Sequence, residues 1–133
     1  MAKLIDKVAW LHLEGGRILS TRSRGKDAYY LPGGKREAGE SDLDTLQREI
    51  AEELTVTILR DTAVHAGTWE ARAHGHAEDV TVRMTCYHAD YTGTLAPSHE
   101  IEEVVWLGYA DRPRVSPVDQ LIFDDLRRAA RLA

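Results

Sequence analysis

Two periodicities of hydrophobic and polar positions divide this chain into helical and extended segments. One set of leucine and isoleucine residues recurs at intervals of three and four, which predicts an amphipathic helix over about residues 42–54. Ser41 precedes this segment and is expected to be its N-cap. Over residues 80–87, apolar Val80, Val82, Met84 and Cys86 alternate with more polar neighbours, and this period of two predicts a strand. The apolar stripe of the helix consists of Leu43, Leu46, Ile50 and Leu54.

The rest of the chain reads mainly as short strands, followed by one terminal helix. Strands or extended segments are predicted over 8–13, 18–21, 28–31, 56–59, 63–73 and 104–107, with a turn over 14–17. Ser116 and Pro117 have the order of an N-cap and a first helical residue, so a second helix begins there. Its buried stripe is expected to be Val118, Leu121, Ile122, Leu126 and Ala129. This order predicts an α/β fold with a mixed sheet between helices.

Composition narrows the classes of protein to consider. The 133 residues suit one domain, and 17 basic against 22 acidic residues give a net charge of −5. A protein that coats nucleic acid is usually basic, so this balance disfavours a nucleic-acid polymer as partner. Cys86 is the only cysteine, which excludes an intrachain disulfide and makes a reducing cytoplasm the expected compartment. No apolar run is long enough to predict a membrane span.

The first predicted helix carries an unusual group of carboxylates. Glu49, Glu52 and Glu53 lie three and four residues apart, so they share neighbouring positions on the helix surface. No lysine lies among them to balance their mutual repulsion. Since oxygen ligands suit hard cations, the group predicts a divalent metal site. Gly33 and Gly34 precede the helix in a turn where the backbone can approach a ligand closely.

The spacing of these residues resembles a known family motif. Gly34, Glu40, the run Arg48-Glu49-Ile50, the pair Glu52-Glu53 and Val56 match eight of the nine fixed positions of the Nudix box. The departure is Thr55, where the family has glycine. The resemblance implies a Nudix fold, an α/β/α sandwich with a mixed central sheet, in one domain over 1–133 with the box at 34–56.

The resemblance also implies an activity and a cofactor. Nudix proteins typically hydrolyse a phosphoanhydride in a nucleoside diphosphate linked to another group, using Mg²⁺ or Mn²⁺. The expected metal ligands are Glu49, Glu52 and Glu53 with the Gly33 carbonyl. Arg48 is expected to hold a catalytic glutamate in place, and Lys35 to reach a phosphate. Glu40 is expected to brace the loop, paired with Arg48.

Several alternatives stay open from the residues alone. The general base is Glu52, Glu49 or Glu100, with Glu103 as a further option. A non-catalytic, regulatory nucleotide-binding module is the other function to consider. The substrate is a small nucleotide, either a nucleoside triphosphate or a nucleotide sugar, and a homodimer is compatible with the family.

Aromatic, histidine and cysteine residues allow a binding role or a structural one. Tyr30 and Trp69 are expected to contact a nucleobase, although aromatic residues in strands more often belong to the core. His74 and His76 fit a turn better than a metal site. Cys86 lies on the apolar side of its strand and is expected to be a buried thiol.

Thr55 carries one more expectation. Glycine just beyond a helix usually takes a left-handed conformation, which a β-branched residue fits poorly. The substitution therefore predicts that the helix ends differently here, through a small local shift.

Overall fold

The computed structural model describes residues 3–73 and 79–133, so the predicted turn at His74 and His76 lies outside the described residues. The strands are β1 (Lys3–Trp10), β2 (Leu13–Glu14), β3 (Arg17–Ser23), β4 (Gly33–Lys35), β5 (Thr57–Ile58), β6 (Val64–Arg72), β7 (Val80–His88), β8 (Tyr91–Thr92) and β9 (Ile101–Leu107). The α-helices are α1 (Asp42–Leu54) and α2 (Pro117–Arg128). Two short 3₁₀ helices span Arg60–Thr62 and Tyr109–Arg114.

A four-stranded mixed sheet in the order β4-β1-β7-β6 forms the centre of the fold. β1 runs parallel to β7 and antiparallel to β4, and β6 is antiparallel to β7. An antiparallel sheet of β2, β3 and β9 lies beside it, and β5 pairs with β8. The predicted turn at Gly15 and Gly16 joins β2 to β3, with φ values of 58° and 77° that suit glycine.

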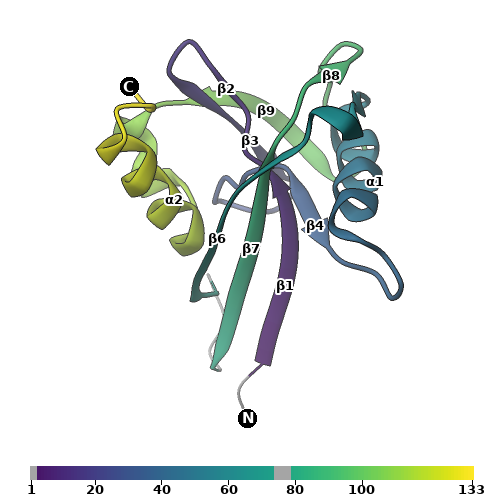
Figure 1. The fold of residues 1–133 in the computed structure, drawn as a ribbon. Coiled ribbons are helices and arrows are strands. Elements are labelled where there is room, and N and C mark those ends of the chain that lie inside the picture. The colour runs from purple at the N-terminus through teal and green to yellow at the C-terminus, as the bar shows by residue number, and fades with distance from the viewer. Residues whose placement is uncertain (1–2, 74–78) are drawn as a thin grey trace.

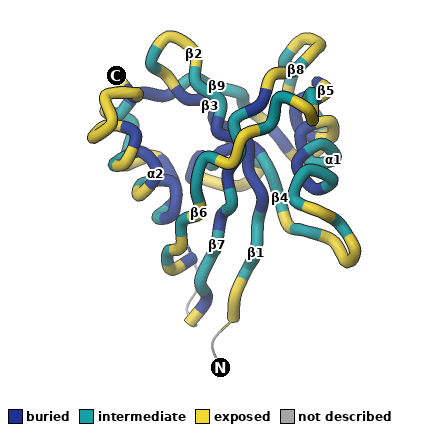
Figure 2. The backbone as a smooth tube through the Cα atoms, in the orientation of Figure 1, coloured by how far each residue is buried: buried dark blue, intermediate teal, exposed yellow. Residues whose placement is uncertain are grey.

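The two α-helices cover opposite faces of the central sheet, α2 on one side and α1 on the other (Figure 1). Alternation along β1 supplies both cores, because successive side chains point to opposite faces. Val8 and Trp10 pack with the stripe of α1, whereas Ala9 and Leu11 pack with α2. Figure 2 shows burial concentrated along the middle of the strands and on the inward sides of both helices. The predicted α/β/α sandwich with a mixed sheet is confirmed.

Helix α1 has the bounds that the sequence predicts. Ser41 caps it, accepting a hydrogen bond from the Asp44 amide at 3.2 Å, and Asp44 returns the bond to the Ser41 amide at 3.1 Å. Leu46, Ile50 and Leu54 are fully buried, which confirms the apolar stripe.

The prediction for Thr55 is wrong. Thr55 occupies the left-handed C-cap position itself, with φ 62° and ψ 23°, and its amide donates to the Ala51 carbonyl. Its hydroxyl donates to the Thr94 carbonyl at 3.2 Å, so a neighbouring loop offsets the cost of this conformation. The helix therefore keeps its ordinary end without a glycine.

Helix α2 begins at Pro117 after the Ser116 cap, as predicted, but its buried stripe differs. Val118, Ile122 and Leu126 are buried, whereas Leu121 and Ala129 are exposed. Phe123 takes the buried position in place of Leu121. Leu121 and Phe123 are both apolar, so the spacing alone did not determine which of them faces the sheet.

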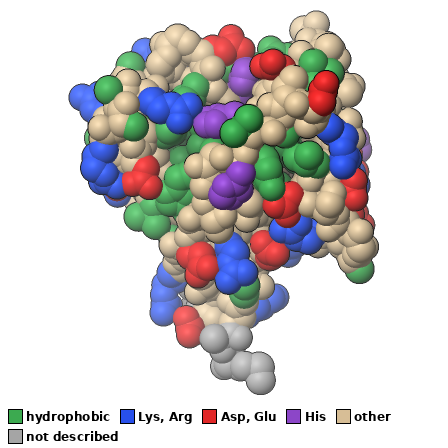
Figure 3. Space-filling model, viewed as in Figure 1, with side chains coloured by type: hydrophobic (Ala, Val, Ile, Leu, Met, Phe, Trp, Pro, Cys, Tyr) green, Lys and Arg blue, Asp and Glu red, His purple; other side chains and the backbone are tan. Residues whose placement is uncertain are grey.

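Charges of both signs are interspersed over the face in Figure 3, and no broad basic patch covers it. Within the described residues, neither α-helix combines the length and apolarity that crossing a bilayer requires. Cys86 is fully buried, and burial raises the pKa of its thiol, as expected for a structural cysteine.

Candidate active site

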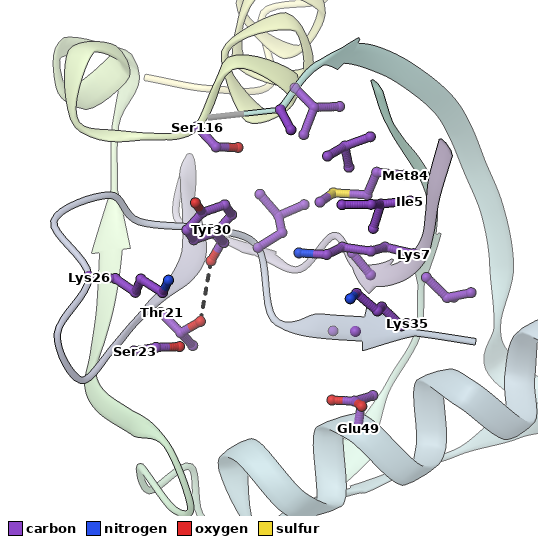
Figure 4. A pocket seen from close by; sticks show the side chains of 18 of the residues that line it. Ile5, Lys7, Thr21, Ser23, Lys26, Tyr30, Lys35, Glu49, Met84 and Ser116 are labelled. Atoms are coloured by element: carbon purple, nitrogen blue, oxygen red, sulfur yellow. Dashed lines mark hydrogen bonds between the residues drawn. The ribbon is translucent and has the colours of Figure 1, made fainter. Parts of the chain in front are cut away.

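A pocket of about 550 Å³ opens beside β1 and β4. Its lining comes from β1, β4, β7, the end of β6, the end of β3 and the loop after it, α1, the segment before β9 and the start of α2. Glu49, Glu53 and Glu100 contribute carboxylates, and Ile5, Val82 and Met84 contribute apolar surface. Figure 4 shows Glu49 reaching toward this space from α1, with lysines and Tyr30 around it. A cavity of this size suits one small-molecule ligand.

The glycine turn determines how closely the α1 carboxylates approach β4. At Gly34, an added Cβ atom would overlap the carboxyl group of Glu49. At Gly33, with φ 150°, it would overlap the backbone of Val8 and Ala9 on β1. Gly33 thus permits the pairing of β4 with β1, and Gly34 leaves room for the carboxyl group of Glu49.

Glu53 is the most deeply placed carboxylate of the box, with 6% of its surface exposed. The Gly33 amide donates to its Oε1 at 3.0 Å. Burial raises the pKa of Glu53 to about 8, and the charges of Glu49 and Glu100 add to the effect. Burial likewise raises the pKa of Glu49. Both carboxylates therefore lie where additional positive charge would stabilise their ionised form.

Arg48 fixes the loop and one of these carboxylates. Its guanidinium donates to both oxygens of Glu40, at 2.7 and 2.9 Å, and to Glu49 Oε1 at 2.9 Å. It also donates to the Lys35 carbonyl at 3.2 Å. Hydrogen bonding to Arg48 lowers the pKa of Glu40 to about 2. This is the bracing contact that the sequence analysis expected of Glu40.

The candidate bases lie in different surroundings. Glu49 and Glu100 line the pocket, although they lie far apart in the sequence. Glu52 is exposed on α1 and does not contribute to the lining. Glu103 accepts hydrogen bonds from Arg22 at 2.6 Å and from the Tyr29 hydroxyl at 3.0 Å, and it does not line the pocket.

Only some of the residues expected to bind substrate line the pocket. Lys35 and Tyr30 line the pocket. Trp69 does not: it packs against the α2-side core, and its indole N–H donates to Asp125 on α2 at 2.7 Å. The structural alternative for this tryptophan, packing against a helix, is the one that the structure favours.

Sequence reasoning missed two groups near the pocket. Lys7 lines it from β1, and burial lowers the pKa of its ammonium. Asp119 is fully buried at the start of α2, where it accepts hydrogen bonds from the Leu31 amide and the Ser116 hydroxyl at 2.7 and 2.8 Å. Lys7 lies two residues from both Ile5 and Ala9, so it shares their side of β1, and this was the one available signal for Lys7.

The oxygen donors present fit a hard divalent cation. Glu53 combines burial with a raised pKa, and no described lysine or arginine forms an ion pair with it. Over residues 3–73 and 79–133, no group of three or more His, Cys, Asp or Glu side chains lies close enough together to hold a metal ion without rearrangement. Glu49 and Glu53 face the pocket together, whereas Glu52 is directed to the solvent side.

Comparison with known proteins places this geometry in a family. The sequence matches the NUDIX domain family over residues 6–126. No curated protein matches it. Among solved structures, the E. coli ORF135 protein is 26% identical, with a TM-score of 0.74 and coverage of 96% of this chain and 94% of that one.

Two further structures share the fold at lower identity. The MutT protein from Methanosarcina mazei Go1 is 20% identical, with a TM-score of 0.76 and coverage of 97% of this chain and 96% of that one. A UDP-X diphosphatase is 17% identical, with a TM-score of 0.66 and coverage of 96% and 61%. The box residues around one pocket and the match over residues 6–126 lead to one conclusion: this chain belongs to the Nudix family and is a pyrophosphohydrolase.

Proposed function

We propose that this protein hydrolyses a phosphoanhydride bond of a nucleoside triphosphate in a reaction that depends on Mg²⁺ or Mn²⁺. The observation that carries the proposal is the convergence of Glu49, Glu53 and Glu100 with Lys35 in one pocket. Carboxylates suit the cation, and lysine suits the phosphates. A volume of about 550 Å³ fits a single nucleotide.

Glu49 and Glu53 are the proposed principal ligands of the cation, with Glu52 and the Gly33 carbonyl completing the set. A bound divalent cation would neutralise phosphate oxygens and lower the pKa of a water molecule. Arg48 keeps Glu49 in position through the hydrogen bond at 2.9 Å. Arg48 is therefore a positioning residue in this proposal.

The chemical step needs a proton acceptor beside the attacking water. Water oxygen forms the new bond to phosphorus, the bridging P–O bond breaks, and the water proton passes to a carboxylate. Glu100 is the proposed base, because it lines the pocket without being bound by an arginine, whereas Glu49 Oε1 accepts from Arg48. Lys35 would bind the phosphate oxygens during this step.

The proposal is tested by product release from a panel of nucleoside triphosphates and nucleotide sugars, with Mg²⁺ or Mn²⁺. Nucleotide sugars belong in the panel because one structural neighbour is a UDP-X diphosphatase. Glu53→Gln should lower kcat/KM by about 10²-fold or more, because it removes a buried anionic ligand.

Glu70→Gln is the matched control. Glu70 is a half-exposed glutamate on β6 that pairs with Arg83, and it does not line the pocket. It should keep the wild-type rate. If the wild type binds metal but turns over no substrate in the panel, the proposed reaction is wrong and a non-catalytic binding module takes its place.

A further inference from the structure

All four lysines of this acidic chain line the same pocket. They are Lys3, Lys7, Lys26 and Lys35, distributed over β1, the loop after β3, and β4. The net charge of −5 means that this gathering is not a reflection of a generally basic surface. Lysine is a compact point charge and a common phosphate ligand. The pocket therefore offers several ammonium groups to an anionic ligand, beside the carboxylates of Glu49, Glu53 and Glu100.

Lys7 holds a special position among the four. It lies directly opposite Lys35 in the antiparallel register of β1 and β4. Figure 4 shows both side chains extending from neighbouring strands into the pocket, with Tyr30 beyond them and Glu49 on the α1 side. Like charges directly opposite each other destabilise a strand pair. A ligand anion between the two ammonium groups would remove this repulsion.

The protein itself does not supply a paired anion for Lys7. Among the described residues, no ion pair to its ammonium is present, and its close partner is the Tyr30 ring, 5.2 Å from Nζ to the ring centroid. Glu49 and Glu53 on α1 and Asp119 on α2 exert an electrostatic attraction. However, Glu53 and Asp119 already accept hydrogen bonds from other groups at 3.0 Å or less.

We propose that Lys7 is a substrate-binding residue whose ammonium binds the phosphate attached to the sugar of the nucleotide. Lys7 lies between Glu49 and Glu53, the proposed ligands of the cation, and Tyr30, which is expected to contact the nucleobase. A group in this position is suited to bind the phosphate nearest the nucleoside. Lys35 then binds the same phosphate or the next one. This inference rests on the proposed function, because it takes a nucleotide as the ligand.

A purely structural role for Lys7 makes a different prediction. If Lys7 only balances Glu53 and Asp119, its removal changes stability but not the preference for a phosphorylated ligand. The deciding measurement is therefore affinity for a nucleoside monophosphate compared with the matching nucleoside, without metal and without turnover.

The experiment titrates AMP, GMP, CMP and UMP, and their nucleosides, into wild type, Lys7→Met and Arg17→Met in the presence of EDTA. Lys7→Met should weaken the best-bound monophosphate about tenfold or more, since a charge-assisted hydrogen bond is lost, and leave the nucleoside unaffected. Arg17→Met removes an exposed cation of β3 that does not line the pocket, and it should change affinity less than about threefold.

The outcomes separate this inference from the proposed reaction. Unchanged monophosphate affinity in Lys7→Met, or no monophosphate binding to wild type, overturns the inference, even if triphosphates are hydrolysed. Binding that depends on Lys7 supports it, even if no triphosphate is turned over. If Lys7→Met does not fold, acetylation of the wild type read by mass spectrometry decides: the monophosphate, but not the nucleoside, should protect Lys7.

Discussion

At the scale of single residues, the adjacent glycines Gly33 and Gly34 have different structural roles. Gly33 permits β4 to pair closely with β1, because a side chain there would overlap the backbone of Val8 and Ala9. Gly34 leaves space for the carboxyl group of Glu49, which is the end of a flexible side chain. One glycine thus serves the fold, and the other serves the candidate site.

This difference predicts opposite results for two alanine substitutions. Gly33→Ala should lower the free energy of unfolding by on the order of 3 kcal/mol, because the backbone cannot yield and the φ of 150° suits glycine. Gly34→Ala should change it by less than about 1 kcal/mol but weaken Mn²⁺ binding at least about tenfold, because Glu49 must move. Urea denaturation and a Mn²⁺ titration measure the two effects. Equal losses of stability in both variants would contradict this assignment.

At the scale of the secondary-structure element, α1 combines three patterns in one helix. Its cap is fixed by Ser41 and Asp44, its buried face by the leucine stripe, and its pocket face by Glu49 and Glu53. Thr55 ends it in the conformation that the family leaves to glycine. We therefore expect the residue at this position to affect the local backbone energy and not the position of the carboxylates.

Thr55→Gly should consequently stabilise the protein without altering the site. Glycine removes the strain of a β-branched residue at φ 62°, whereas the lost hydroxyl bond to Thr94 lies at an exposed position. The free energy of unfolding should rise by about 0.5–1 kcal/mol in urea denaturation. Mn²⁺ affinity should stay within about twofold of wild type. A large loss of metal affinity would show that the position of the helix end does control the carboxylates.

At the scale of the whole molecule, the fold buries charge that the isolated chain would leave in water. Glu53 has a pKa of about 8 in the folded protein, whereas an unperturbed glutamate has 4.5. Between these pH values the folded state binds more protons than the unfolded state, so stability falls as pH rises through this window. Asp119, with a pKa raised to about 6 by burial, adds a change of the same sign at lower pH.

Metal-free wild type should therefore lose stability as pH rises from 6 through about 8, and Glu53→Gln should lose less. At pH 9 the variant should be more stable by on the order of 1–3 kcal/mol, since its side chain remains neutral. Mg²⁺ should restore stability to the wild type but not to the variant, because a ligand that binds only the folded state stabilises it. Thermal unfolding across this pH range, with EDTA or Mg²⁺, checks both effects. Parallel curves for the two proteins in EDTA would show that Glu53 does not titrate in this window.

Much of this protein is determined by local sequence. The bounds and cap of α1, the glycine hairpin and the strand over residues 80–87 follow from periodicity, capping and turn chemistry, which act between near neighbours. The box spacing likewise identified the family and the group of glutamates on α1. These features need no information about which distant segments meet.

Only the tertiary structure decided which of these residues share the pocket. Glu100 and Lys7 come together with Glu49 and Glu53 because β1 pairs with β4 and the segment before β9 lies beside them. Two predicted positions differ in the structure. Trp69 contacts α2 and does not line the pocket, and Leu121 is exposed and does not belong to the core. Burial and long-range pairing depend on the whole chain, so no pattern within a single segment could determine them.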